Sequence, residues 1–128
     1  GGIFGHSAAI ALEDNATINN CSAHSDGGGI YALSGCYVTL ADASRITQCV
    51  AADDGGGIYG QSASIALKDD ATINECSAHI DGGGIYASPG CYVSLTDASW
   101  ITQCVAADDG GGIYGQSASI ALKDDATI

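Results

Sequence analysis

Residues 55–81 read GGGIYGQSASIALKDDATINECSAHID, and residues 27–54 read GGGIYALSGCYVTLADASRITQCVAADD. The two segments open on the same five letters and then share one order of small, aliphatic and acidic residues. Glycine triplets followed by Ile-Tyr begin at Gly27, Gly55, Gly82 and Gly110. Internal repeats of this length predict a solenoid, a propeller or another repeat array.

The repeat has two alternating forms, the second of which is one residue longer than the first, so the true unit is a pair such as residues 27–81. Residues 110–128 copy residues 55–73 letter for letter. We therefore treat the chain as one domain of successive coils, and we expect it to be part of a longer repeat array. The coils are residues 1–26, 27–54, 55–81, 82–109 and 110–128, the last being incomplete.

Each coil contains three short apolar stretches separated by Gly, Asp and Ser, the residues that favour turns. The middle stretch alternates in the manner of a strand, because Ile65 and Leu67 flank the small Ala66. Three short strands in each coil predict an all-β fold, a single-stranded parallel β-helix. Leucine-rich repeats have a different Leu/Asn pattern, and propeller blades need about 40 residues each.

In such a solenoid, equivalent residues of successive coils stack about 4.8 Å apart. Three aliphatic columns are therefore predicted to form a narrow core. They are Ile3, Ile30, Ile58, Ile85 and Ile113; Leu12, Leu40, Leu67, Leu95 and Leu122; and Ile18, Ile46, Ile73, Ile101 and Ile128. No coil buries its own apolar face, so stability is expected to come from stacking.

The composition excludes several classes of function. Three Lys and Arg stand against fifteen Asp and Glu, a formal charge of −12, so nucleic-acid binding is not expected. No apolar run approaches the roughly 20 residues that span a membrane. At 46% hydrophobic residues, the chain is too apolar for a disordered acidic tail.

Two adjoining elements carry a resemblance to a known family. Residues 73–78 (INECSA) lead into Gly82–Tyr86, and residues 46–51 (ITQCVA) lead into Gly55–Tyr59. This order resembles the polymorphic outer-membrane protein repeats of chlamydial adhesins, in which phenylalanine-x-x-asparagine precedes glycine-glycine-aliphatic. Here Ile replaces the phenylalanine and Cys the asparagine. The resemblance implies a right-handed parallel β-helix exposed outside a cell.

Six cysteines fall at two positions of the repeat. Cys21, Cys49, Cys76 and Cys104 recur once per coil, and their spacing fits no zinc motif. They are interpreted either as an inward column of small apolar residues in place of an asparagine ladder, or as disulfides between adjacent coils. The other two, Cys36 and Cys91, lie two rungs apart. We hypothesise that these two cross-link to a neighbouring molecule.

Acidic residues form a second set of columns. Asp26, Asp54, Asp81 and Asp109 each precede a glycine triplet, and another Asp follows the Leu strand of every coil. Stacked carboxylates repel one another, which backbone hydrogen bonds, raised pKa values or a bound Ca²⁺ would relieve. Turn capping is one prediction for these residues, and a calcium site formed by the four aspartates is the other. No other cofactor is expected.

Aromatic residues and sequons suggest surface roles. Tyr31, Tyr59, Tyr86 and Tyr114 follow the inward Ile by one residue, so they are expected to point outward together with Trp100 as an aromatic face. Such a face stabilises a sheet by stacking, or binds a protein or glycan. Asn15 and Asn20 fit the N-x-[ST] pattern of N-glycosylation.

No group of residues fits a nucleophile, base and orienting residue at one place, so enzymatic activity is not expected. The leading functional prediction is an extracellular structural protein that forms a rigid rod or fibril through β-helix stacking. The alternative is an adhesin stalk or passenger domain that binds a host protein or glycan through the aromatic face. Self-association is expected in the first case.

Overall fold

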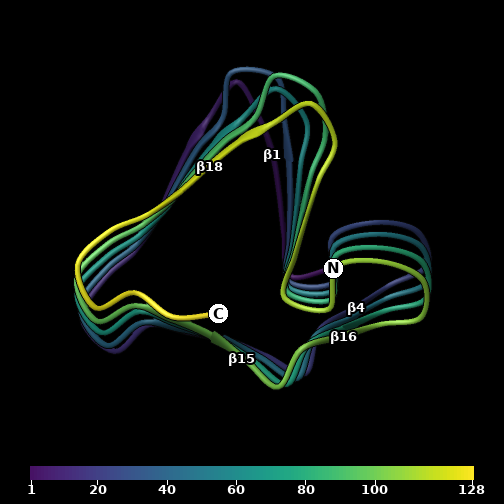
Figure 1. Ribbon diagram of the computed structural model, residues 1–128. Helices are drawn as coiled ribbons and strands as arrows, with labels where there is room; N and C mark the ends of the chain where they lie inside the picture. Colours follow the sequence, from purple (N-terminus) through teal and green to yellow (C-terminus); the bar gives the residue numbers. More distant parts are fainter.

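The computed structural model describes residues 1–128 as an all-β solenoid without helices. Its eighteen strands pair only in parallel and form four sheets that run along the stack. Viewed along the axis, successive coils superpose on one outline with a loop projecting beside β4 and β16 (Figure 1). The predicted parallel β-solenoid is therefore confirmed.

Each sheet collects one strand from each of the four complete coils, and the first two sheets gain a fifth from the last coil. The first contains β1 (Ile3–His6), β5 (Ile30–Leu33), β9 (Ile58–Gly60), β13 (Ile85–Ala87) and β17 (Ile113–Gly115). The second contains β2 (Ala9–Leu12), β6 (Tyr37–Leu40), β10 (Ser64–Leu67), β14 (Tyr92–Leu95) and β18 (Ser119–Leu122). The third contains β3 (Thr17–Asn19), β7 (Arg45–Thr47), β11 (Thr72–Asn74) and β15 (Trp100–Thr102).

The fourth sheet is an addition to the three strands per coil that the sequence predicts. It contains β4 (Ser22–Ala23), β8 (Val50–Ala51), β12 (Ser77–Ala78) and β16 (Val105–Ala106). A strand of two residues shows no alternation that a sequence pattern can reveal. Each complete coil therefore has four strands, three longer and one very short.

The three predicted aliphatic columns form the core, except for Leu122 and Ile128 of the last coil, which are 44 and 52% exposed. Ile58, Leu67 and Ile73, one from each column of the middle coil, have no exposed surface. Val38 and Ile65 pack beside the leucine column and are equally buried. Because every rung contributes the same apolar shapes, the core is continuous along the axis.

The difference in length between the two forms of the coil is confined to one corner. Ala32 pairs with Gly60 in the next coil, and Tyr37 pairs with Ser64. The segment from Ala32 to Tyr37 is therefore one residue longer than the matching segment from Gly60 to Ser64. The extra residue of the longer coil therefore lies between β5 and β6. The alternate coils take different paths at this corner, the upper one in Figure 1, and superpose closely elsewhere.

The glycine triplet is required for three separate reasons. Gly55 has φ of +69°, which favours glycine. A Cβ on Gly56 would lie 2.4 Å from the carbonyl oxygens of Gly83 and Ser77, so two backbones meet there. A Cβ on Gly57 would lie 2.8 Å from Cγ2 of the core residue Ile73.

The structure holds no helix that could serve as a membrane span.

Candidate functional site

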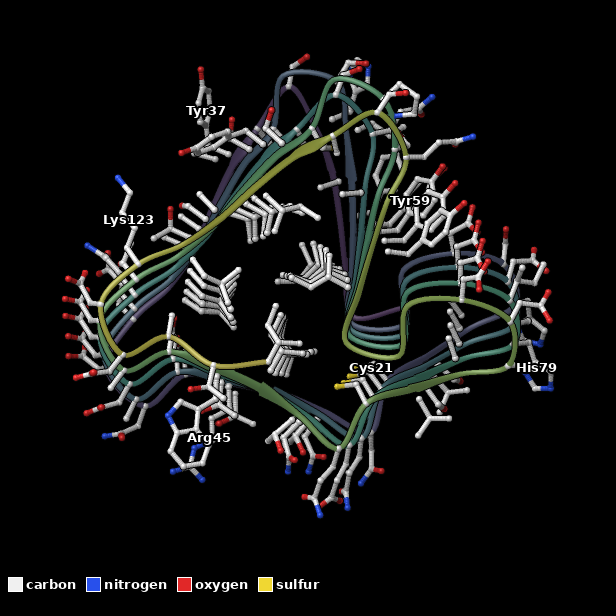
Figure 2. All side chains as sticks on the ribbon, in the orientation of Figure 1. Cys21, Tyr37, Arg45, Tyr59, His79 and Lys123 are labelled. Atoms are coloured by element: carbon white, nitrogen blue, oxygen red, sulfur yellow. The ribbon has the colours of Figure 1, made fainter.

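The cysteine column lies inside the solenoid, as its small apolar interpretation predicts. Cys49 and Cys76 are 0 and 1% exposed, and Figure 2 shows the sulfur of Cys21 on the inner side of the ribbon. The thiol of Cys76 donates to the carbonyl oxygen of Asn74 at 3.4 Å and to that of Ile46, in the preceding coil, at 3.8 Å. The thiols thus occupy a column between two rows of backbone carbonyls.

All six cysteines are free thiols in the structure. Hydrogen bonds with the thiols of Cys104 and Cys49, together with burial, raise the pKa of Cys76. A raised pKa keeps the thiol protonated and slow to react. No disulfide joins neighbouring coils in this structure.

Cys36 and Cys91 lie in the core at the corner between the first two sheets, at 1 and 3% exposure. A Cβ on Gly5 or on Gly60, each one coil earlier, would approach the sulfur of Cys36 or Cys91 to 3.2 Å. Glycine therefore leaves room for these two sulfurs. A cross-link from either cysteine to another molecule would require this corner to open.

The aspartates before the glycine triplets form a ladder of hydrogen bonds. The backbone N–H of Asp54 donates to Asp26 Oδ1 at 3.2 Å, that of Asp81 to Asp54 at 3.1 Å, and that of Asp109 to Asp81 at 2.9 Å. Burial raises the pKa of Asp54, and the neighbouring carboxylates of Asp26 and Asp81 add to the rise. The hydrogen bond from Asp81 opposes it.

The second aspartate ladder runs in the opposite direction. Here the backbone N–H of Asp14 donates to Asp42 Oδ2 at 3.0 Å, and the N–H of Asp42 and Asp69 donate in turn to the next coil at 3.3 Å. These aspartates have φ between +54° and +58°, the left-handed conformation that Asp tolerates. In both ladders the carboxylates cap turns, which is one of the two predicted roles.

No group of three or more His, Cys, Asp or Glu side chains is arranged to hold a metal ion. The predicted calcium site at Asp26, Asp54, Asp81 and Asp109 is a row of carboxylates in which the first three each accept a hydrogen bond from the backbone N–H of the next coil. Calcium binding stays a prediction, which melting temperatures measured in Ca²⁺ and in EDTA would test.

The tyrosines of the first sheet form a continuous stack. Ring centroids lie 5.0 Å apart for Tyr31 and Tyr59, 5.1 Å for Tyr59 and Tyr86, and 5.2 Å for Tyr86 and Tyr114. Phe4 extends the stack at 5.6 Å from Tyr31. Burial raises the pKa of Tyr59 to about 12, with a further contribution from the charge of Asp26. Tyr86 is buried within the stack and Phe4 at its end is exposed, and the charges of Asp26 and Asp54 act on Tyr59 from the first aspartate ladder.

Trp100 does not share a face with these tyrosines, so the single aromatic face predicted from the sequence is divided. Trp100 belongs to the third sheet, whereas Tyr37 and Tyr92 project from the second. These three are 52, 65 and 48% exposed. Figure 2 shows Tyr37, Tyr59 and Arg45 pointing outward on three different sides. Sequence columns alone do not reveal which strands share a sheet face.

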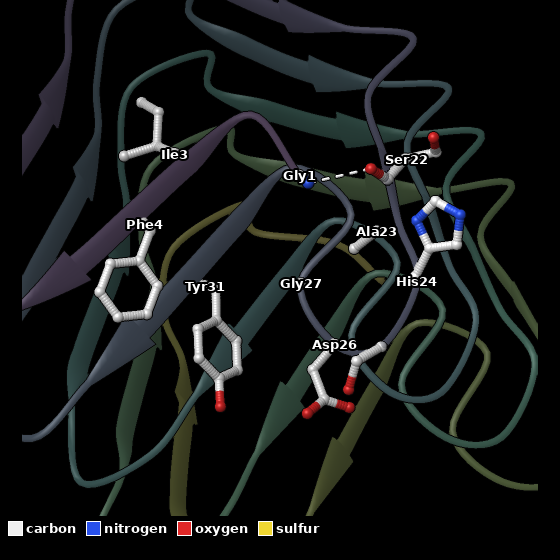
Figure 3. Close-up of a pocket in the computed structure, with 10 residues that line it drawn as sticks. Gly1, Ile3, Phe4, Ser22, Ala23, His24, Asp26, Gly27 and Tyr31 are labelled. Carbon is white, nitrogen blue, oxygen red and sulfur yellow. Dashed lines mark hydrogen bonds between the residues drawn. The ribbon is translucent and has the colours of Figure 1, made fainter.

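Two hollows interrupt the surface. One of about 470 Å³ lies at the first coil between Phe4, Tyr31 and the segment Ser22–Gly27 (Figure 3). There the amino group of Gly1 donates to the carbonyl oxygen of Ser22 at 2.9 Å. The second, of about 390 Å³, lies on the third sheet between Arg45 and Trp100. No sequence pattern points to this second hollow, because it depends on which residues stack.

The two sequon asparagines are exposed. Thr17 Oγ1 donates to the backbone carbonyl of Asn15 at 3.2 Å. Asn20 occupies a corner with φ of +54°. Glycosylation at either asparagine stays a prediction.

Comparison of the chain with protein-family models, with curated proteins and with solved structures finds no match. The likeness to the polymorphic outer-membrane protein repeats therefore remains a resemblance in residues and in fold class.

Proposed function

We propose that the protein is an extracellular structural repeat protein that forms a stiff rod or fibril by axial stacking of its coils. The observation that carries this proposal is the strict register along all four sheets. Ile30 pairs with Ile58, and Ile58 with Ile85, without a slip. Each coil thus offers its neighbours the same axial interface, into which a further unit fits.

The distribution of differences between coils supports the proposal. The long coils 27–54 and 82–109 differ at five positions, Leu33/Ser88, Ser34/Pro89, Thr39/Ser94, Ala41/Thr96 and Arg45/Trp100. The inward Ile, Leu and Cys columns do not change between these two coils. The repeat therefore retains the interior that stacking requires. A negative charge of −12 disfavours side-by-side aggregation of such rods.

Electron microscopy of the native material tests this role. Continuous filaments with an axial repeat of about 4.8 Å are expected. Compact particles without an axial repeat would contradict the structural role.

A second proposed role is that of an adhesin stalk or passenger domain. It is favoured by one observation, the exposure of Trp100 beside a hollow on the third sheet. Isolated rods at a cell surface, together with loss of binding when Trp100 is replaced, would support this role over the fibril. Binding that is unchanged by Trp100→Thr would contradict it.

A further inference from the structure

The outward column of the third sheet alternates between small and large side chains. In successive coils the positions hold Thr17, Arg45, Thr72, Trp100 and Thr127. Arg45 and Trp100 lie two rungs apart, about 9.6 Å between their backbones, with the short Thr72 between them. The hollow of about 390 Å³ on this sheet is the slot that this alternation creates.

The slot has two unlike walls and a polar floor. The indole of Trp100 forms one wall and the guanidinium of Arg45 the other. The polar residues Thr47, Thr72, Asn74, Thr102 and Gln103 line the remainder. One aromatic plane among polar side chains suits a polar ligand that has a single apolar face.

Arg45 is the one charged side chain that lines the slot. Its side chain is exposed and takes no part in the side-chain hydrogen bonds next to the slot. The carboxylate of Glu75, beside the floor strand β11, accepts hydrogen bonds from Gln48 at 3.0 Å and from Asn74 at 3.3 Å instead. The guanidinium therefore keeps its donors available for an anionic group from outside the chain.

We propose that this slot binds a sugar residue carrying one carboxylate, as in a uronic acid. Its apolar ring face packs on the indole of Trp100, and its carboxylate accepts hydrogen bonds from Arg45, whose fork of donors matches carboxylate geometry. Its hydroxyl groups meet Thr72, Thr102 and Gln103. The net charge of −12 repels a dense polyanion, so the site takes an isolated or terminal acidic sugar.

The inference names the ligand of the second proposed role and does not depend on axial stacking. Filaments without sugar binding, or sugar binding without filaments, therefore separate the two proposals. The protein supplies its own probe, because Trp100 is its single tryptophan. Its fluorescence reports occupation of the slot directly.

The experiment titrates the full chain with methyl glucuronide, methyl glucoside and sodium acetate, following Trp100 fluorescence. A saturable change in fluorescence is expected with methyl glucuronide. The affinity for methyl glucoside is expected to be about fivefold lower, because the neutral sugar cannot form the exposed ion pair with Arg45. Acetate is expected to have no comparable effect. A response to acetate equal to that of the glucuronide, equal affinity for both sugars, or no saturable response would overturn the proposal.

Two variants locate the site. Arg45→Thr introduces threonine, which alternate coils already carry in this column, so the fold should be retained. The preference for the acidic sugar is expected to vanish, because the guanidinium is gone. Thr72→Tyr fills the slot and is expected to abolish binding of both sugars. Ser64→Tyr is the matched control, because it fills the equivalent gap between Tyr37 and Tyr92 on the second sheet. Binding that survives Thr72→Tyr, or that Ser64→Tyr removes, would contradict the assignment.

Discussion

The carboxylate of Asp54 accepts a hydrogen bond from the backbone N–H of Asp81 in the next coil, with 3.1 Å between Oδ1 and N. Its own N–H donates to Asp26 Oδ1 at 3.2 Å. One residue type thus serves as donor and acceptor in an axial ladder. The ladder caps the turns, but it also stacks like charges one rung apart.

The pH dependence of stability follows from this ladder. The pKa of Asp54 is raised in the folded state. The contribution of Asp54 to the free energy of unfolding is therefore fully present below the unfolded-state pKa, and it is lost as the pH rises through the folded-state pKa. Asp54→Asn keeps an acceptor oxygen without the charge. The free energy of unfolding of this variant, measured against the wild type, should therefore rise as the pH increases above about 4, the ordinary pKa of Asp. Urea unfolding measures this, and a difference independent of pH would contradict the raised pKa.

The close backbone approach at Gly56, the second glycine of its triplet, predicts a cost that depends on position. Gly56→Ala forces a Cβ against two carbonyl oxygens and should destabilise the fold by about 3 kcal/mol. Gly111 is the matched control, since its Cβ would closely approach only the carbonyl oxygen of Cys104, at 3.1 Å. Gly111→Ala should cost less than about 1 kcal/mol in chemical denaturation. Equal costs at the two positions would refute the packing explanation.

The tyrosine stack predicts that ring shape matters more than the hydroxyl group. Tyr59→Ala removes two stacked contacts and should cost about 2 kcal/mol. Tyr59→Phe should be nearly neutral, because Phe4 already occupies this column. Thermal or urea unfolding of both variants makes the comparison. A Phe variant as unstable as the Ala variant would show that the phenol oxygen, rather than stacking, stabilises the column.

The buried thiols predict a distinct reactivity pattern. A thiol reagent should find six thiols per chain after denaturation without reductant. In the folded protein, the half-buried Cys104, whose pKa is lowered, should react before the buried Cys76, whose pKa is raised. Fewer than six thiols, or a dimer on non-reducing electrophoresis, would instead indicate disulfides between coils or molecules.

Much of the fold follows from the sequence because stacking repeats one set of contacts. The Ile, Leu and Cys columns could be read from the spacing of the glycine triplets, as every coil presents them in the same order. The two-residue strand Ser22–Ala23 could not, because two residues carry no periodicity. The slot beside Arg45 could not be predicted from the sequence either, because it depends on the sizes of the side chains on three neighbouring rungs.

The opposite directions of the two aspartate ladders could not be predicted from the sequence either. Asp42 and Asp54 are the same residue type in turns of the same coil, yet the carboxylate of Asp42 meets an N–H of the preceding coil and that of Asp54 an N–H of the following one. Side-chain direction at a corner depends on local φ, which is +54° at Asp42. A residue column thus identifies which residues stack, whereas the backbone decides what each carboxylate touches.

Units are expected to add along one axis without changing the cross-section, and small-angle X-ray scattering tests this most directly. The chain is compared with versions extended at Ile128 by one and two further copies of residues 74–128, which continue the repeat in register because Ile128 corresponds to Ile73. Each added copy contributes two rungs and should lengthen the particle by about 9.6 Å at a constant cross-sectional radius. A growing radius, or added copies that behave as separate beads, would contradict the account.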